Sequence, residues 1–157
     1  MKPMKASVKQ VIDTLAAAGL DVEVQEYAAS TRTAEDAAAA LGVTVGQIVK
    51  SLVFLADGQA VLALVSGSNR VDVVKLAALT GATITRADAD TVRRLTGFSI
   101  GGVPPVGHES RLPTYCDPEL LTYNLVWAAA GTPNSVFAIS PTRLVQLAAA
   151  QVADFCA

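Results

Sequence analysis

Histidine and cysteine are scarce in this sequence: His108 is the only histidine, and Cys116 and Cys156 are the only cysteines. A structural zinc site takes four Cys or His ligands, so these counts argue against a metal site. Two distant cysteines also do not make the disulfide framework of a small secreted domain. We therefore expect a cytoplasmic protein without a metal ion, in which Cys116 is buried in an apolar strand and Cys156 is frayed near the chain end.

Charged residues are also few. Only 17% of the 157 residues are charged, 52% are hydrophobic, and the net charge is −2. A chain this apolar is not disordered, and its balance of charge predicts no broad basic surface for nucleic acid. The length suffices for one domain with a hydrophobic core, so we expect a single domain over residues 1–157.

Long uninterrupted apolar runs are absent. The most apolar stretch, residues 51–66, is broken by Asp57 and Gly58 and is shorter than the roughly 18 apolar residues that a membrane span needs. The lysines within residues 1–10 are not followed by the apolar run of a signal peptide. We expect no association with a membrane.

Helix and strand patterns are interspersed along the chain. Apolar residues at helical spacing, capping residues and terminal glycines predict helices at 4–18, 33–42, 72–80, 88–95 and 141–150. Alternating or continuous apolar runs predict strands at 22–27, 51–56, 59–65, 83–85, 112–116, 125–129 and 136–139. Asp57-Gly58 predicts a two-residue hairpin turn in the middle of a covered sheet. The fold class is therefore α/β, with a mixed, mostly antiparallel central sheet flanked by helices.

Lys50 stands directly before the apolar hairpin. One interpretation is a lysine at a strand end whose ammonium group reaches water. The other is a fixed positive charge at a cleft, where it would stabilise a developing oxyanion.

The segment Gly101–Gly107 contains five Gly or Pro among seven residues. It is neither a phosphate-binding P-loop nor a dinucleotide fingerprint, because the required residues and spacing are missing. Glycine lets a backbone approach a ligand closely and proline fixes the shape of a loop, so the segment could aim N–H groups at an ester carbonyl. A tight connection between two elements is the alternative.

Two further segments have a structural and a functional interpretation. His108 could be a general base, but no Ser-His-Asp pattern surrounds it, and polar surface is the alternative. Residues 131–134 form a predicted turn between two strands of the central sheet. The same turn could be a rim of the pocket.

Taken together, several segments resemble the YbaK/ProX family of freestanding aminoacyl-tRNA deacylases, which are similar to the editing domain of bacterial prolyl-tRNA synthetases. The resemblance spans nearly the whole chain and rests on the order of segments that are each weak alone. These are residues 48–54, the loop 97–108 with 111–114, and Gly131-Thr132-Pro133-Asn134 before a strand that ends in Ser140-Pro141.

The resemblance implies a pocket for the aminoacylated 3′ end of tRNA and hydrolysis of the ester that joins a wrong amino acid to the terminal ribose. Lys50 matches the essential lysine of the family, and Gly101–Pro105 matches its Gly-x-x-x-Pro loop, whose Gly101 and Gly102 would supply N–H donors. The implied substrate-binding residues are Tyr27, Ser99, Ile100, Val103, Pro104, Pro105, His108, Ala129, Gly131, Thr132 and Val136. An aminoacyl ester is already activated, so no covalent nucleophile and no cofactor are expected.

At two positions the sequence departs from the family. Members that act on cysteinyl-tRNA(Pro) have a serine and an aspartate where this chain has Ala129 and Val136. The amino acid removed therefore stays open among cysteine, alanine, serine and threonine, with tRNA(Pro) among the expected carriers and a prolyl-tRNA synthetase as an implied partner. A non-catalytic module that binds a tRNA end or a synthetase, and a hydrolase for another small ester, are the alternatives. The sequence leaves open whether the chain forms a homo-oligomer.

Overall fold

The computed structural model describes residues 6–27, 33–108 and 111–157. Its helices are α1 (Ala6–Ala17), α2 (Ala34–Leu41), α3 (Val73–Thr80), α4 (Ala89–Thr96) and α5 (Pro141–Ala148), with the short 3-10 helices η1 (Val45–Gln47) and η2 (Pro118–Thr122). Its strands are β1 (Val24–Glu26), β2 (Val49–Ala56), β3 (Gln59–Ser66), β4 (Ile84–Arg86), β5 (Thr114–Cys116), β6 (Val126–Ala129), β7 (Ser135–Ile139) and β8 (Gln151–Val152). The predicted start of the first helix at residues 4 and 5 lies outside the described residues.

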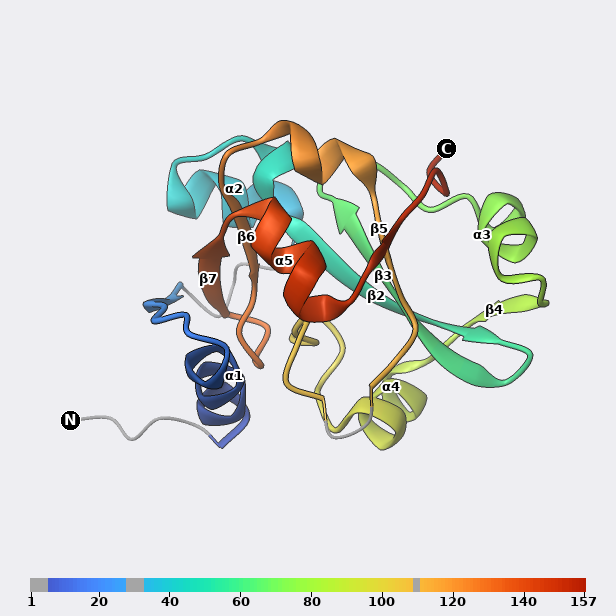
Figure 1. Cartoon of the computed structure of the whole chain (residues 1–157), viewed down its shortest axis with the longest axis horizontal. Coiled ribbons are helices and arrows are strands. Elements are labelled where there is room, and N and C mark those ends of the chain that lie inside the picture. The colour runs from blue at the N-terminus through green and yellow to red at the C-terminus, as the bar shows by residue number, and fades with distance from the viewer. Residues whose placement is uncertain (1–5, 28–32, 109–110) are drawn as a thin grey trace.

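The strands form two sheets (Figure 1). The larger has the order β4-β2-β3-β5-β8, and the smaller has the order β1-β7-β6. Within the larger sheet β5 lies parallel to β3 and β8, and all other neighbours are antiparallel. The expected α/β class with mostly antiparallel strands is confirmed.

The expectation of one central sheet is wrong in one respect. The strands on either side of residues 131–134, β6 and β7, belong to the smaller sheet and not to the larger one. A single parallel bridge between Ile48 and Trp127 links β6 to the start of β2. The apolar pattern of a strand shows that a face is buried, but it does not identify the neighbouring strand.

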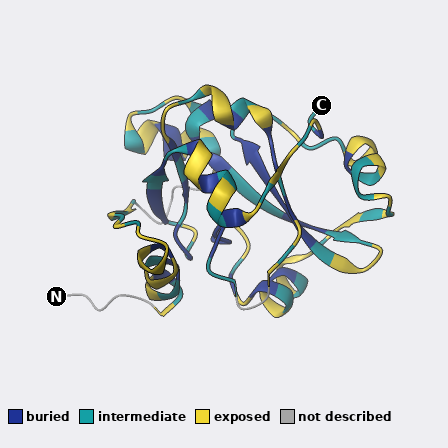
Figure 2. Cartoon of the chain, in the orientation of Figure 1, coloured by how far each residue is buried: buried dark blue, intermediate teal, exposed yellow. Residues whose placement is uncertain are grey.

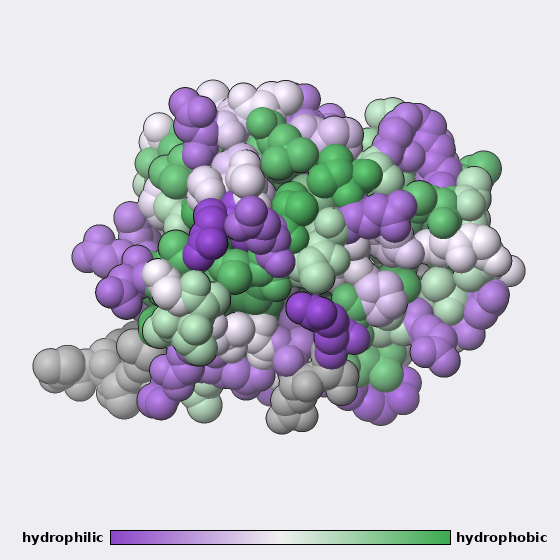
Figure 3. All heavy atoms as spheres, viewed as in Figure 1, coloured by the Kyte–Doolittle hydropathy of each residue, from purple (hydrophilic) through white to green (hydrophobic). Residues whose placement is uncertain are grey.

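The hairpin of β2 and β3 occupies the middle of the larger sheet, as predicted. Asp57 and Gly58 have φ angles of 50° and 83°, the left-handed values that a two-residue hairpin turn requires. Buried residues are concentrated in β3, β5, β6 and β7, whereas the short strands β1, β4 and β8 contain none (Figure 2). Outside this core, hydrophobic and hydrophilic residues are interspersed on the face that Figure 3 shows.

The chain end is ordered, and the expectation of a frayed Cys156 is wrong. Cys156 pairs with Val71, and the Asp72 N–H donates to Phe155 O at 2.8 Å. Phe155 is fully buried and anchors this segment, which sequence periodicity missed because the strand before it has only two residues. Burial raises the pKa of Cys156, and also that of the buried Cys116, to about 12. Within the described residues, no helix combines the length and apolar character needed to cross a membrane.

Candidate active site

A cavity of about 1000 Å³ lies along an open edge of β2. β4 pairs with β2 only at Phe54–Ala56, and the Ile48–Trp127 bridge lies at the other end. Between these points the edge of β2 has no strand partner among the described residues, and the cavity occupies this space. Its walls come from β2, α2, β4, the loop after α4 and the strands of the smaller sheet.

The structure brings seven of the fourteen predicted site residues into this cavity. They are Tyr27, Lys50, Ile100, Gly101, Val103, Ala129 and Val136. They come from segments that are far apart in the sequence, and Ala129 and Val136 are direct partners in the β6–β7 ladder. These two residues give the cavity an apolar wall.

Lys50 is part of β2 and is held in place by a hydrogen bond. Its Nζ donates to Asn69 O at 2.5 Å, which leaves two ammonium N–H donors for a ligand. Burial lowers the pKa of Lys50, and the negative charges of Glu35 and Asp117 act in the opposite direction. The side chain is therefore partly desolvated, unlike a lysine that reaches freely into water.

The charged side chains described in the lining of the cavity are all positive. Arg70 and Arg86 line it together with Lys50, and no Asp or Glu belongs to its described lining. This is notable in a chain of net charge −2. Neither arginine is distinguished by its local sequence, because only the pairing of Arg86 with Phe54 and the course of the loop after β3 bring them to the cavity.

Ser51 presents polar groups at the open edge of β2. Its Oγ is buried and has no hydrogen-bond partner among the described residues. Leu64, the partner of Ser51 in β3, accepts a bond from Asp117 N at 2.9 Å and so turns its backbone toward β5. In an antiparallel ladder this makes Ser51–Leu64 a non-hydrogen-bonded pair, so the N–H and C=O of Ser51 face the open edge.

The glycine-rich loop differs from expectation at Gly102. Its N–H donates to Ser99 O at 2.9 Å and closes a turn, and Gly102 does not line the cavity. A Cβ on Gly102 would lie 2.6 Å from the backbone carbon of Thr132, so this glycine permits a close approach of two backbones. Gly101 N–H has no acceptor among the described residues, and Gly101 lines the cavity.

The other predicted residues do not line the cavity. They are Ser99, Gly102, Pro104, Pro105, His108, Gly131 and Thr132. Ser99 Oγ accepts a bond from Arg93 at 2.9 Å, and a Cβ on Gly131 would lie 2.7 Å from Ser7 O of α1. Their contacts fix the two loops that shape the cavity.

The turn at residues 131–134 also holds Tyr27. Tyr27 N donates to Asn134 O at 3.0 Å, and Asn134 Nδ2 donates to Tyr27 O at 3.2 Å. Burial raises the pKa of the Tyr27 hydroxyl. Pro133 lines the cavity, so one residue of this turn contributes directly to the rim.

His108 is a partly buried anchor of the loop and not surface. Its Nε2 bonds to Pro104 O at 2.7 Å, and its ring packs edge-to-face on Phe98 with centroids 5.4 Å apart. A carbonyl can only accept, so Nε2 carries the proton, and the buried Nδ1 has no partner among the described residues. Burial lowers the pKa of His108, because a charge at this site would be desolvated.

This lowered pKa predicts acid sensitivity. Between the lowered pKa and the ordinary value of 6.5, the unfolded chain binds more protons at His108 than the folded chain. Its contribution to stability is therefore present above pH 6.5 and is lost as the pH falls through the folded-state pKa. We expect His108→Gln, which can still donate to Pro104 O, to flatten this dependence, by at most about 1.4 kcal/mol per pH unit. Urea unfolding at a series of pH values measures it, and equal slopes for both proteins would contradict the prediction.

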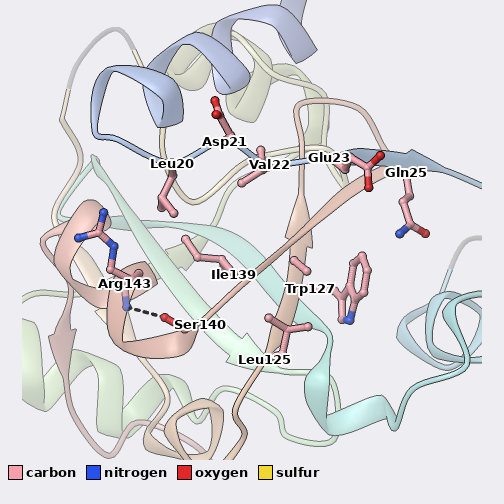
Figure 4. Close-up of a pocket in the computed structure, with 11 residues that line it drawn as sticks. Leu20, Asp21, Val22, Glu23, Gln25, Leu125, Trp127, Ile139, Ser140 and Arg143 are labelled. Atoms are coloured by element: carbon pink, nitrogen blue, oxygen red, sulfur yellow. Dashed lines mark hydrogen bonds between the residues drawn. The ribbon is translucent and has the colours of Figure 1, made fainter.

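A second hollow of about 400 Å³ lies against the smaller sheet (Figure 4). Its lining includes Asp21, Glu23 and Arg143, and Trp127 contributes to both cavities. It contains none of the predicted site residues and mixes charges of both signs. Among the described residues, no three His, Cys, Asp or Glu side chains are grouped so as to hold a metal ion.

Comparison with known families gives a match over most of the chain. The family described as "Aminoacyl-tRNA editing domain" matches residues 28–147. The uncharacterized protein YwhH of Bacillus subtilis is 32% identical over 136 residues, which cover 85% of this chain and 87% of YwhH. A proline–tRNA ligase of Desulforamulus reducens is 41% identical over 104 residues, which cover 62% of this chain and 18% of the ligase.

Solved structures agree with the family match. A crystal structure of a candidate trans-editing enzyme for prolyl-tRNA synthetase superimposes with a TM-score of 0.93, at 49% identity and 99% coverage of both chains. The hypothetical protein APE2540 superimposes with a TM-score of 0.87, at 33% identity, over 94% of this chain and 99% of that protein.

Proposed function

The chain belongs to the aminoacyl-tRNA editing domain family, as its resemblance to YbaK/ProX predicted, and on this basis we propose that it is a trans-acting aminoacyl-tRNA deacylase. Its substrate is a tRNA that carries a wrong amino acid, and its site of action is the cytoplasm. The observation that carries the proposal is the partly desolvated ammonium group of Lys50. It lies in a cavity that Arg70 and Arg86 also line, and no Asp or Glu is among the described lining residues.

The proposed reaction is a direct hydrolysis. Water adds to the ester carbonyl, the C–O bond to the ribose breaks, and the ribose oxygen takes a proton, so that a free amino acid and an uncharged tRNA result. Lys50 Nζ and Gly101 N–H are the donors that we assign to the developing oxyanion. The neighbouring ribose hydroxyl places the water, as the family resemblance implies.

The cavity suits a short single-stranded end of tRNA. Arg70 and Arg86 are exposed at its wall and are available to the phosphates of that end. Ile100 is 55% exposed at the rim and offers an apolar surface to a base, as in other single-strand sites. Binding of only this end of the tRNA agrees with the net negative charge of the whole chain.

We expect Arg70→Gln and Arg86→Gln to raise KM for charged tRNA while kcat stays near the wild-type value. Each loses about one phosphate contact, which lowers the slope of log affinity against log salt by about 0.7 for a single strand. Arg143→Gln, in the smaller hollow, is the control. The same assay on a small aminoacyl ester, which has no phosphate, should show no effect. Equal KM values for charged tRNA in all four proteins would contradict the prediction.

The test of the function is a deacylation panel. It contains Cys-, Ala-, Ser- and Thr-tRNA, with tRNA(Pro) among the carriers, and correctly charged Pro-tRNA(Pro). Loss of one mischarged species with Pro-tRNA(Pro) spared supports editing and names the substrate. Rapid cleavage of a simple ester with no preference for tRNA would favour a general small-ester hydrolase instead.

One observation favours the second candidate, a module that binds a tRNA end or a synthetase without turnover. Gly102 N–H is already bonded to Ser99 O, so the loop offers fewer free donors than the family resemblance implied. Binding of charged tRNA with no hydrolysis of any panel member would select this candidate. Addition of prolyl-tRNA synthetase to either assay tests whether that enzyme is a partner, since it should then lower the apparent KM.

A further inference from the structure

A buried carboxylate, that of Asp117, lies beneath the loop that contacts Lys50. Asp117 is 2% exposed and caps η2, where its Oδ1 accepts the Glu119 N–H at 2.9 Å. Its Oδ2 accepts the Ser66 N–H at 3.1 Å and Asn69 Nδ2 at 2.8 Å. Within the described residues no lysine or arginine forms an ion pair with it. The Asp117 carboxylate is therefore bonded to the end of β3 and to the loop that follows it.

The loop of residues 66–70 is fixed from both of its sides. Ser66 is fully buried, and its Oγ donates to Gly46 O at 2.8 Å. Asn69 N donates to Ser66 O at 2.9 Å, which closes a turn. A Cβ on Gly67 would lie 2.4 Å from Val45 O, so the loop lies directly against η1. The carbonyl at the end of this turn, Asn69 O, is the acceptor for Lys50 Nζ.

We propose that Asp117 and Asn69 are positioning residues for Lys50: the carboxylate orients the Asn69 side chain, and the fixed Asn69 carbonyl then holds the ammonium group in the cavity. The role in catalysis rests on the proposed function, whereas the positioning of Lys50 does not. A free lysine side chain has about 2 kcal/mol of rotamer entropy, so an ammonium group held before substrate binds is better prepared to meet an oxyanion.

Other charges near Lys50 do not supply this fixed contact. Glu35 and Arg70 act on Lys50 only through their charges, and neither has a hydrogen bond or ion pair with it among the described residues. The charge of Asp117 also acts on the Cys156 thiol, whose pKa is raised by burial first and by this charge second. The hydrogen bond to Asn69 O is thus the contact that fixes Lys50, and Asn69 is in turn bonded to Asp117.

Two variants separate positioning from folding. Asn69→Ala removes the amide that bonds to Asp117 but keeps the carbonyl that Lys50 contacts. Asp117→Asn keeps the size of the side chain, but its NH2 group must face an N–H donor, either that of Glu119 or those of Ser66 and Asn69. The control is Asp57→Asn, because Asp57 also accepts a distant backbone N–H, that of Thr83 at 2.9 Å, at the far end of the hairpin.

The measurements are kcat and KM for a charged tRNA, and the order of the Lys50 side chain from the 1H–13C NOE at Cε in lysine-labelled protein. The chain has five lysines, and Lys50→Arg identifies the signal of Lys50. We expect an ordered Cε in the wild type and in Asp57→Asn. In folded Asn69→Ala and Asp117→Asn we expect a mobile Cε, with kcat lowered about tenfold or more and KM nearly unchanged.

An ordered Lys50 Cε in both folded variants, or a change confined to KM, would overturn the proposal. Should Asp117→Asn fail to fold, Asn69→Ala decides alone, because the Asn69 side chain is only partly buried. If the wild type hydrolyses no charged tRNA, the proposed function fails, but the NOE still decides whether Asp117 and Asn69 position Lys50.

Discussion

Lys50→Ala is expected to lower the rate of deacylation by about 100- to 1000-fold, the usual effect of losing one oxyanion donor. The fold should survive, because Lys50 contributes one hydrogen bond and Asn69, whose carbonyl loses this donor, is only partly buried. Single-turnover hydrolysis of a charged tRNA measures the loss, and circular dichroism reports on the fold.

Lys75→Ala is the matched control for this loss. Lys75 also donates to a backbone carbonyl, that of Cys156 at 2.9 Å, but its side chain lies at the surface. The rate that depends on Lys50 should also fall as the pH rises through the lowered pKa of Lys50, because the ammonium form is the active one. Retained hydrolysis by folded Lys50→Ala would exclude Lys50 as the oxyanion partner.

Local sequence patterns predicted the elements better than their arrangement. Asp57-Gly58 fixed the hairpin, and the residues Thr33, Asp72 and Asp88 cap the helices that follow them. These features depend on a few adjacent residues, so a sequence shows them directly. The division into two sheets depends instead on which strands pair across distant segments, and apolar alternation carries no such information.

The candidate site was predictable only where resemblance supplied a residue. Lys50, Gly101 and Ala129 were expected in one pocket, and they line one cavity. Asn69 and Arg70 were missed, because nothing in their local sequence distinguishes a loop that contacts Lys50 from any other polar loop. The partial burial of His108 was not predictable for the related reason that it comes from Phe98 and Pro104, which contact it only in the folded loop.

Gly102→Ala is expected to be the second most damaging substitution. The new Cβ would lie 2.6 Å from the carbon and 2.8 Å from Cα of Thr132, closer than carbon atoms approach, so one backbone has to move. The turn at 131–134 is held in place, because the Thr132 and Ser135 hydroxyls bond to each other at 2.6 Å and Asn134 bonds to Tyr27. The glycine-rich loop therefore moves and takes Gly101 N–H with it.

The expected cost of this movement is about 1–3 kcal/mol of unfolding free energy and about a 100-fold loss in kcat/KM. Gly81→Ala is the matched control: Gly81 has a φ of 69° with nothing within 4 Å of a Cβ, so it loses stability through backbone strain and leaves the cavity intact. We expect the effect of Gly101→Ala to lie between those of the other two substitutions. Its φ of 84° strains the backbone, and the atom nearest to a new Cβ is 3.8 Å away. Urea unfolding and deacylation kinetics on the three folded variants separate strain from displacement. Wild-type kinetics in Gly102→Ala would mean that the contact between the loop and the turn does not set the position of the Gly101 donor.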